Sequence, residues 1–363
     1  MEIVLAGVAS VDEEAESFAK EYGIGQVTRD YRRLLENPDI DVIDICTPPV
    51  CHFSMIKDSI EAGKHVICEK PLTGFFEKEG VFPEHIGQVS KREMFEKVTG
   101  EMDELQQLLK RHERQHFFYS ENFVYAPAVQ KCAEILRAKG SKILSIKGEE
   151  SHGGSHAPHA AFWSASGGGS FIRQGCHPLS AALYLKQVEA KARGEAITVV
   201  SVIGDMAVTQ ACLSEEERRY IRSRPHDVED LANVILTFSD GTKASIVSGD
   251  MIVGGVRNLI EVFTNEGVYL QNMAPNNGFC AYHVDEQNLE NVYFTEKVET
   301  KTGWQSLYIN EEIARGYVGE LRDFVECVIW GRRPQSDFAL ARETVKVVYG
   351  AYCSAEEGRR FDF

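Results

Sequence analysis

Short apolar runs alternate with amphipathic stretches over the first third of the chain. The apolar runs predict strands at residues 3–9, 42–46, 65–68 and 117–120. The amphipathic stretches predict helices at residues 12–22, 31–36, 53–62 and 91–114. Gly23 and Gly63 follow two of these helices, where a glycine commonly ends a helix. Strands that alternate with helices are typical of a parallel sheet built from βαβ units.

The pattern changes in the second part of the chain. Residues 73–98 are rich in glycine, phenylalanine and charge, and they predict a surface excursion over the sheet edge before the second part begins. After Asn122 we expect a helix, a strand, a loop rich in glycine and histidine, and a helix that starts near Gly169. Longer strands follow at residues 199–208, 231–238, 244–249 and 258–264. The turns at 239–241 and 265–267 are hairpin signals, so this sheet is predicted to be mostly antiparallel, and helices at 311–329 and 340–356 close the chain.

Charge and cysteine usage limit the classes of function. The formal net charge of -16 disfavours a nucleic-acid or anionic-membrane partner, because phosphate groups attract a basic surface. The nine cysteines are scattered singly with no CxxC pair, the pattern of reduced thiols in the cytosol. We find no signal peptide and no apolar run long enough to span a membrane. The predicted location is cytoplasmic.

The segment at residues 62–72, AGKHVICEKPL, ends a buried strand in a charged pair. Glu69 and Lys70 follow the β-branched run, and Pro71 stops the strand. Ligands of open α/β sheets bind beyond the carboxyl ends of the strands, so an acid and an amine here are placed for chemistry. Taken alone, the pair favours the interpretation of a solvated charge pair at a strand end.

A second segment, GGGSFIRQGCHP at residues 167–178, combines three glycines with two basic side chains. Glycines that open a helix let backbone and ligand approach closely. Arg173 and His177 are four residues apart, so both project from one helical face. The alternative is a flexible loop ahead of a helix whose histidine belongs to the core.

In order along the chain, these motifs resemble the Gfo/Idh/MocA-type sugar and cyclitol oxidoreductases. The resemblance rests on DVIDICTPP at residues 41–49 with His52, AGKHV at 62–66, Glu69-Lys70-Pro71, GGG with Gly175 and His177, and SAEEGRR at 354–360. It implies a fold of class α/β plus α+β. A Rossmann-like dinucleotide-binding domain with a parallel sheet would occupy residues 1–121. A domain with an open, mostly antiparallel sheet, which binds substrate and builds oligomers, would occupy residues 122–363.

The resemblance also implies roles for individual residues. Lys70 resembles the lysine that touches the substrate and tunes proton transfer, and His177 resembles the general acid/base. The implied cofactor-binding residues are Thr47, Pro48, Pro49, His52, Glu69 near the nicotinamide ribose, and Asn122 in the crevice. The chemistry agrees, because a histidine titrates near neutral pH and suits removal of a hydroxyl proton. A lysine serves better as a hydrogen-bond donor unless burial lowers its pKa.

Arg173 departs from the family pattern, which commonly has an acidic residue one helical turn before the histidine. A guanidinium cannot act as a base, but it binds a carboxylate or phosphate through two hydrogen bonds. The hypothesis is an anionic or sugar-acid-like substrate. The alternative, that Arg173 pairs with a neighbouring carboxylate, stays open.

The cofactor domain departs more strongly. The family's domain begins with a strand and a Gly-rich phosphate turn, whereas residues 3–9 match its second strand, so the domain is N-terminally incomplete. Gly23-Ile24-Gly25 follows a helix and predicts a helix stop, not a phosphate cradle. The chain is then either shortened relative to the functional protein or a paralogue impaired in cofactor binding. Ser10 stands where the family often carries the ribose-binding acid, which favours NADP or tolerance of both cofactors.

Histidines at positions 152, 156 and 159 suggest metal ligands at first sight. The intervening glycines and Pro158 argue against one helical face, and no cysteine or carboxylate shares the spacing, so no metal is predicted. We expect His152 and His156 to line a sugar pocket. Trp163 either stacks on a sugar face or belongs to the core.

The predicted function is an NAD(P)-dependent oxidoreductase that acts on a secondary hydroxyl of a sugar, cyclitol or glycoside. One alternative is an NAD-dependent glycoside hydrolase of the same architecture, and another is a non-catalytic sugar-binding paralogue. A sheet with one open face usually buries that face against a partner, so a homodimer or homotetramer is expected.

Overall fold

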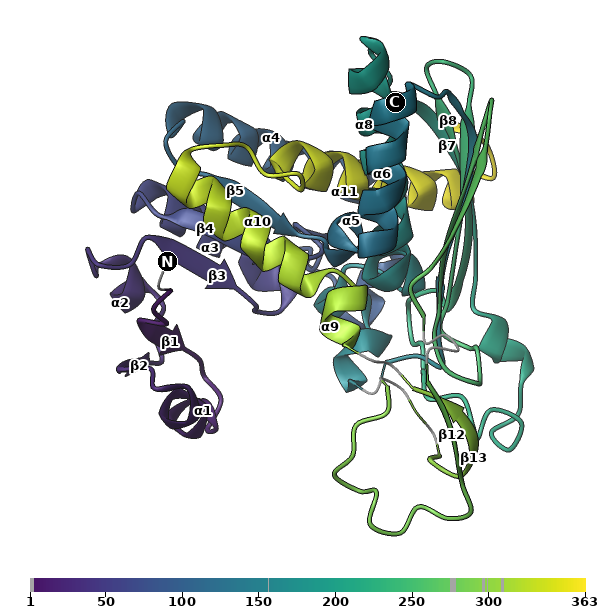
Figure 1. Ribbon diagram of the computed structural model, residues 1–363, viewed down its shortest axis with the longest axis horizontal. Coiled ribbons are helices and arrows are strands. Elements are labelled where there is room, and N and C mark those ends of the chain that lie inside the picture. Colours follow the sequence, from purple (N-terminus) through teal and green to yellow (C-terminus); the bar gives the residue numbers. More distant parts are fainter. Residues whose placement is uncertain (1–2, 156, 275–278, 296–297, 299, 308–309) are drawn as a thin grey trace.

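The computed structural model describes residues 3–155, 157–274, 279–295, 298, 300–307 and 310–363. A small parallel sheet with its helices and a large sheet stand side by side, and long helices run between them (Figure 1). The predicted fold class, a parallel-sheet part followed by a mostly antiparallel one, is confirmed.

The parallel strands form two separate sheets. β3 (Val42–Ile45), β4 (His65–Glu69) and β5 (Phe117–Ser120) pair in that order, and all are parallel. β1 (Gly7–Ala9) and β2 (Gln26–Thr28) pair only with each other. Among the described residues, the outer edge of β3 therefore carries no neighbouring strand.

The helices of this part follow the predicted pattern closely. They are α1 (Ala15–Tyr22), α2 (Arg32–Leu35), α3 (His52–Glu61) and α4 (Lys91–Arg111), with short 3-10 turns at Pro49–Cys51 and Pro83–Gln88. Gly23 ends α1 in the left-handed conformation, with φ 68°, and its N–H bonds back to the carbonyl of Ala19. The G-x-G at this position is a helix stop, as predicted.

The segment between Pro71 and α4 is a surface excursion only in part, because residues 77–80 and 82–85 are exposed whereas residues 71–75 are buried. Phe75 is buried, and its N–H donates to the hydroxyl of Tyr349 at 2.7 Å. Further along, the N–H of Gly87 donates to the carboxylate of Asp227 at 2.8 Å. Both partners belong to the second part of the chain, so this segment joins the two parts of the molecule. Phe75 therefore serves packing, whereas Phe82 is 69% exposed, and composition alone does not distinguish the two.

The second sheet has seven strands. In spatial order they are β11 (Val268–Asn272), β10 (Arg257–Thr264), β6 (Ile143–Ser151), β9 (Lys243–Gly249), β8 (Leu231–Phe238), β7 (Val199–Ala207) and β14 (Phe361–Asp362). Neighbours are antiparallel except β6 and β9, which are parallel. Buried and exposed residues alternate along the strands, as the period of two requires.

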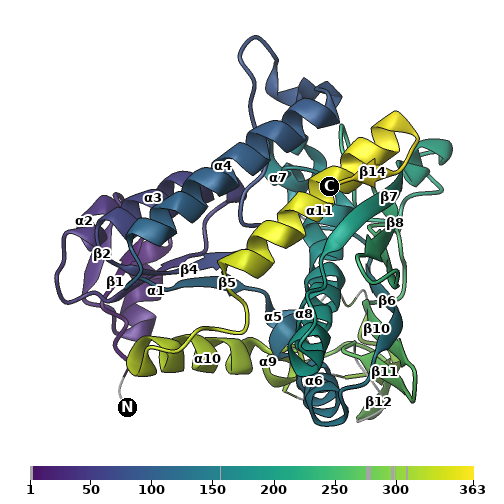
Figure 2. The ribbon, with the colours of Figure 1, turned by 90° about the horizontal axis from the view of Figure 1, so that it is seen from above.

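Helices cover only one face of this large sheet (Figure 2). The remaining helices are α5 (Asn122–Tyr125), α6 (Pro127–Lys139), α7 (Trp163–Ser166), a π-helical turn (Phe171–Gly175), α8 (Cys176–Arg193), α9 (Glu311–Ala314), α10 (Tyr317–Trp330) and α11 (Phe338–Glu357). Two 3-10 turns, Pro158–Ala161 and Thr209–Cys212, and a hairpin of β12 (Cys280–His283) and β13 (Gly303–Ser306) complete the fold. On the other face, apolar side chains are exposed at Leu144, Val200, Ile203, Ile235 and Leu270.

The C-terminal helices return to the first sheet. Phe118 and Phe117 are neighbours on β5 and point to opposite faces. Phe118 stacks on Phe324 of α10 at 4.9 Å between ring centroids, and Phe117 meets Phe338 at the start of α11 edge to face at 5.6 Å. The helix predicted at 311–329 is split at Gly316, which has φ 100° and leaves no room for a Cβ beside the carbonyl of Asn122. This packing fixes α10 over the carboxyl ends of the strands.

We predict that Phe324→Ala loosens this packing. Its ring is fully buried and also contacts Tyr125, so removal should lower the free energy of unfolding by about 3–5 kcal/mol. Urea unfolding monitored by circular dichroism measures the change. Leu321→Ala, on the same helix but half-exposed, should cost less than about 1 kcal/mol. Equal losses in the two variants would contradict the docking of α10 through Phe324.

Candidate active site

A polar cavity of about 330 Å³ lies at the carboxyl ends of β4 and β5, where the two parts of the molecule meet. Its wall is made largely of charged and hydrogen-bonding side chains. Those used below are Glu69, Lys70, Asn122, Glu150, His152, Arg173, His177, Arg315 and Glu320. The sequence motifs at Glu69-Lys70 and at Arg173 and His177 therefore meet at one cavity, although they are about a hundred residues apart.

Lys70 crosses from the first sheet to the helical segment of the second part. Its ammonium group donates to the backbone carbonyl of Arg173 at 2.6 Å. Burial lowers the pKa of Lys70, but the negative charge of nearby carboxylates, first of all Glu69, opposes this effect, and the pKa is raised above its ordinary value. Lys70 is therefore a permanent cation and a hydrogen-bond donor.

His177 is held on two sides. Its ring stacks on Phe123 at 5.0 Å between centroids, and its Nδ1 lies 2.6 Å from Oε1 of Glu121. Glu121 is fully buried and is not part of the cavity wall. The thiol of Cys176 is also close, but two ligands of a tetrahedral zinc ion stand about 3.3 Å apart, wider than the observed 2.6 Å. The short contact is therefore a hydrogen bond.

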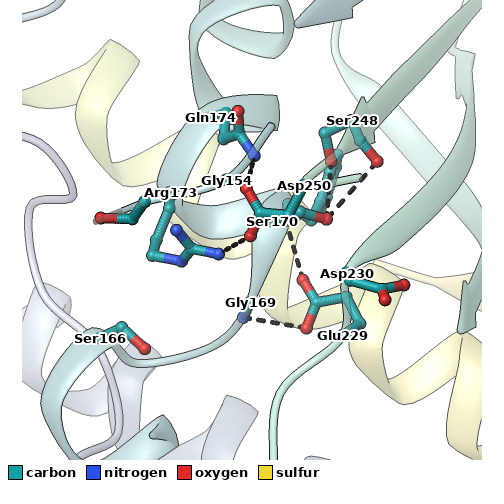
Figure 3. A network of polar contacts seen from close by, with 12 residues as sticks. Gly154, Ser166, Gly169, Ser170, Arg173, Gln174, Glu229, Asp230, Ser248 and Asp250 are labelled. Carbon is teal, nitrogen blue, oxygen red and sulfur yellow. Dashed lines mark hydrogen bonds and ion pairs between the residues drawn. The ribbon is translucent and has the colours of Figure 1, made fainter. Parts of the chain in front are cut away.

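Arg173 is paired within the protein. Its guanidinium forms an ion pair with Asp250, which also accepts from the amide of Gln174 (Figure 3). Asp250 is fully buried at the end of β9, so the pair is largely shielded from water. Arg173 thus pairs with a neighbouring carboxylate, which is the second of the two interpretations that its sequence position allowed.

The three glycines that precede this helical segment pack against protein. Gly168 has φ 150°, and a Cβ there would lie 2.3 Å from the hydroxyl of Tyr352. Gly167 lies against Gly74 and Tyr349 in the same way. The glycines allow close contact between segments of the chain, not the approach of a ligand that the motif suggested.

Glu229 anchors the start of the same segment. Its carboxylate accepts from the N–H groups of Gly169 and Phe171, both at 2.9 Å (Figure 3). Burial raises the pKa of Glu229, and these hydrogen bonds oppose the rise. A buried carboxyl thus replaces the usual N-cap, and it fixes the start of the helical segment that carries Arg173 and His177.

The predicted cofactor residues divide into two groups. Pro49, Glu69 and Asn122 line the cavity. Thr47, Pro48, His52 and Ser10 are not part of its wall.

Two residues of the second group make contacts of their own. His52 is fully buried, and its ring nitrogens lie 2.8 Å and 2.9 Å from the carbonyls of Pro71 and Thr47, so it joins the two loops that carry Pro49 and Lys70. The hydroxyl of Ser10 contacts Asp12 at the end of β1.

Of the histidine-rich loop and Trp163, only part lies at the cavity. His152 lines the cavity and is nearly buried, with Nδ1 accepting from the N–H of Gly154. His156 lies outside the described residues. Trp163 is buried away from the cavity, between Tyr352 and the ammonium of Lys91, so its place is that of a core residue.

Sequence reasoning missed several residues of the cavity wall, and the charged ones among them are Glu150, Arg315 and Glu320. Glu150 could have been predicted, because it lies on the buried face of β6, near the end of the strand and two residues before His152. No local signal marks Arg315 and Glu320, since only the return of α10 brings them here. Burial, reinforced by repulsion from Glu121, Glu69 and Asp44, raises the pKa of Glu320 to about 9.

These residues fit one half of a nicotinamide dinucleotide. Glu69, Pro49 and Asn122 surround the position beyond the strand ends where the nicotinamide and its ribose would lie. A Gly-rich turn that would hold the pyrophosphate is not found among the described residues before β3.

Two family models match this chain. Residues 2–78 match the one described as "Oxidoreductase family, NAD-binding Rossmann fold", and residues 136–270 match "GFO/IDH/MocA C-terminal domain". Together they cover more than half of the 363 residues.

The curated relatives match over a short stretch. An uncharacterised oxidoreductase, YrbE, of Bacillus subtilis is 51% identical over 57 residues, which are 16% of this chain and 17% of that protein. Levoglucosan dehydrogenase of Pseudarthrobacter phenanthrenivorans is 45% identical over 60 residues, 16% of this chain and 15% of that enzyme. The chain thus matches about a sixth of the length of these relatives.

Solved structures match over nearly the whole fold. GenD2 from gentamicin A biosynthesis, solved in complex with NAD, has a TM-score of 0.77 at 23% identity, over 99% of this chain and 89% of that one. A levoglucosan dehydrogenase in complex with NADH and levoglucosan has a TM-score of 0.69 at 19% identity, over 99% and 90%. No helix in the described part of the chain is long and apolar enough to span a membrane.

We predict that Glu320→Gln changes how stability depends on pH. The folded state keeps a proton on Glu320 up to about pH 9, while the unfolded chain loses it near its ordinary value of 4.5. The wild type therefore loses stability as pH rises through this window, and the neutral glutamine does not. Urea midpoints at pH 5 and pH 8 should show the variant gaining on the wild type at the higher pH. A difference independent of pH, or the same gain in Glu312→Gln on the exposed surface of α9, would contradict the assignment.

Proposed function

The chain belongs to the Gfo/Idh/MocA oxidoreductase family, and from this premise we propose that it is an NAD(P)-dependent dehydrogenase of a secondary hydroxyl on a sugar, cyclitol or glycoside. The observation that carries the proposal is the convergence of Lys70 and His177 on one polar cavity at the ends of parallel strands. In this proposal, residues 1–121 bind the cofactor and residues 122–363 bind the substrate and a second subunit.

The proposed mechanism uses the two basic side chains in different ways. His177, held at Nδ1 by Glu121, presents Nε2 to remove the hydroxyl proton of the substrate. Lys70 stays charged and donates a hydrogen bond to the same oxygen, which stabilises the negative charge that develops there. When bound, a nicotinamide dinucleotide supplies the acceptor for the hydride that leaves the carbon. Glu69 and Asn122 would orient its ribose and ring.

A neutral polyhydroxylated substrate fits the cavity better than an acidic one. The guanidinium of Arg173 is already paired with Asp250, and the wall adds the carboxyls of Glu69, Glu150 and Glu320. Burial raises the pKa of Glu150, and its carboxyl oxygens can accept hydrogen bonds from substrate hydroxyl groups. The ion pair between Arg173 and Asp250 thus favours a neutral substrate over a sugar acid.

The open face of the seven-stranded sheet supports a homodimer or homotetramer. Its exposed apolar residues, Leu144, Val200, Ile203, Ile235 and Leu270, belong to neighbouring strands and no helix covers them. Burying them against a second copy is the expected arrangement, and light scattering measures it.

A non-catalytic sugar-binding paralogue is the second candidate. The break between the β1–β2 sheet and β3 favours it, because the pyrophosphate site of a Rossmann domain lies at that position. Calorimetric titration with NAD and NADP decides between the two: binding supports the dehydrogenase, and no heat with either cofactor supports the paralogue. Ser10, which leaves room for a 2′-phosphate, predicts that NADP is not strongly disfavoured.

We predict that Lys70→Met and His177→Asn each lower turnover at least about 100-fold, because one removes the charge on the reacting oxygen and the other the base. Reduction of the cofactor is followed at 340 nm with a panel of neutral sugars and cyclitols. His65→Asn, at the opposite end of β4 from Lys70, should leave the rate within about twofold. Near-normal rates in both site variants would remove the catalytic assignment, and product without net reduced cofactor would indicate a hydrolase.

We predict that Asp250→Asn shifts preference towards acidic substrates. The substitution releases Arg173, whose guanidinium can then pair with a substrate carboxylate. The ratio of kcat/KM for sugar acids to that for the matching neutral sugars should rise about tenfold or more, a gain in line with one charge-assisted hydrogen bond. Asp205→Asn makes the same charge change on the exposed side of β7 and should leave the ratio as it is. An unchanged ratio in Asp250→Asn would show that Arg173 does not set this preference.

A further inference from the structure

Glu121 stands directly behind His177. The residue immediately follows β5, on the first sheet, whereas His177 belongs to α8 of the second part. Both are buried, and the 2.6 Å contact between Oε1 and Nδ1 links them across the junction. The same oxygen also lies near the N–H of Phe123, whose ring stacks on the histidine.

We propose that Glu121 is the positioning residue of this active site, which fixes the tautomer of His177 so that its Nε2 is free to accept the substrate proton. The proposal rests on the dehydrogenase function proposed above. Position 173, where the resemblance leads one to expect an acid beside the histidine, carries an arginine that is paired with Asp250. The carboxylate that serves His177 therefore comes from a different element, the end of β5.

The tautomer follows from the contact. An ionised carboxylate only accepts hydrogen bonds, so Nδ1 must be the nitrogen that carries the proton. A neutral imidazole has one N–H, which leaves the lone pair on Nε2. Stacking on Phe123 restricts rotation of the ring, so this nitrogen keeps its direction. Without an acceptor at Nδ1, the proton can move to Nε2, and the ring is then no base for the substrate.

Glu121 acts through His177 and not on the substrate. It is absent from the cavity wall, and its own side chain is fully buried. Its removal should therefore lower kcat with little change in KM. A residue that merely supported the fold would change stability without altering which nitrogen of His177 is protonated.

The test is the protonation state of the ring, measured by two-bond ¹H–¹⁵N NMR on protein with ¹⁵N-labelled histidine, without substrate or cofactor. His177→Asn assigns the signal among the eleven histidines. The wild type should show the Nδ1–H form, and Glu121→Met should move the population to the Nε2–H form. Glu320→Gln removes another buried carboxyl on the cavity wall, and it should leave the tautomer unchanged.

The activity measurement complements the spectrum. Glu121→Met should lower kcat on the order of 100-fold, and Glu121→Gln, which keeps a weaker acceptor of the same size, should recover part of that loss. An Nε2–H form in the wild type, or an unchanged tautomer in Glu121→Met, would overturn the proposal. If Glu121→Met does not fold, the wild-type spectrum and Glu121→Gln still decide it. The spectrum is recorded without turnover. A lack of activity on every sugar tested would therefore contradict the proposed function without contradicting the role of Glu121 in fixing the tautomer.

Discussion

The hydrogen bond from the Lys70 ammonium to the carbonyl of Arg173 is the contact on which the site depends. A buried amine must find partners, and this one finds its nearest acceptor on the backbone of the other part of the molecule. The bond therefore fixes the end of β4 against the start of α8 and, with it, the spacing between Lys70 and His177. Gly167, packed against Gly74, supports the same junction, while His52 orders the loop that carries Lys70 and Glu229 orders the start of the segment that carries Arg173.

Electrostatics give the cavity its character. The carboxyls on its wall and behind it outnumber the cations that remain uncommitted, since Arg173 is paired with Asp250. Burial raises the pKa of Glu150 and, with repulsion from neighbouring carboxylates, that of Glu320 to about 9. The protonated Glu320, the other carboxyl oxygens and the charged Lys70 make a surface of hydrogen-bond donors and acceptors, which suits hydroxyl groups. A substrate carboxylate would instead face several acids, while Arg173 is paired with Asp250 and Arg315 with Glu311.

Local patterns predicted the parts of the fold that local forces determine. The strand that ends at Glu69 and the helix stop at Gly23 were predictable from the sequence. Hydrophobic period, strand propensity and the left-handed conformation of a glycine all depend on only a few neighbouring residues. The meeting of Lys70 with His177 came from a resemblance, not from periodicity. The buried contacts of the segment predicted as a surface excursion, residues 73–98, were not predictable because their partners, Tyr349 and Asp227, are far along the chain. Glu121 lay beside the predicted Asn122, but only the docking of α8 shows that it faces the histidine.

The most direct test of the account is a crystal structure of the chain with bound NADH. The convergence of strand ends, lysine and histidine predicts that the nicotinamide ring lies inside the cavity, beside Glu69 and within reach of a hydroxyl held between Lys70 and His177. A ring bound at any other surface, with Lys70 and His177 turned away from it, would contradict the claim that this cavity is where the chemistry takes place.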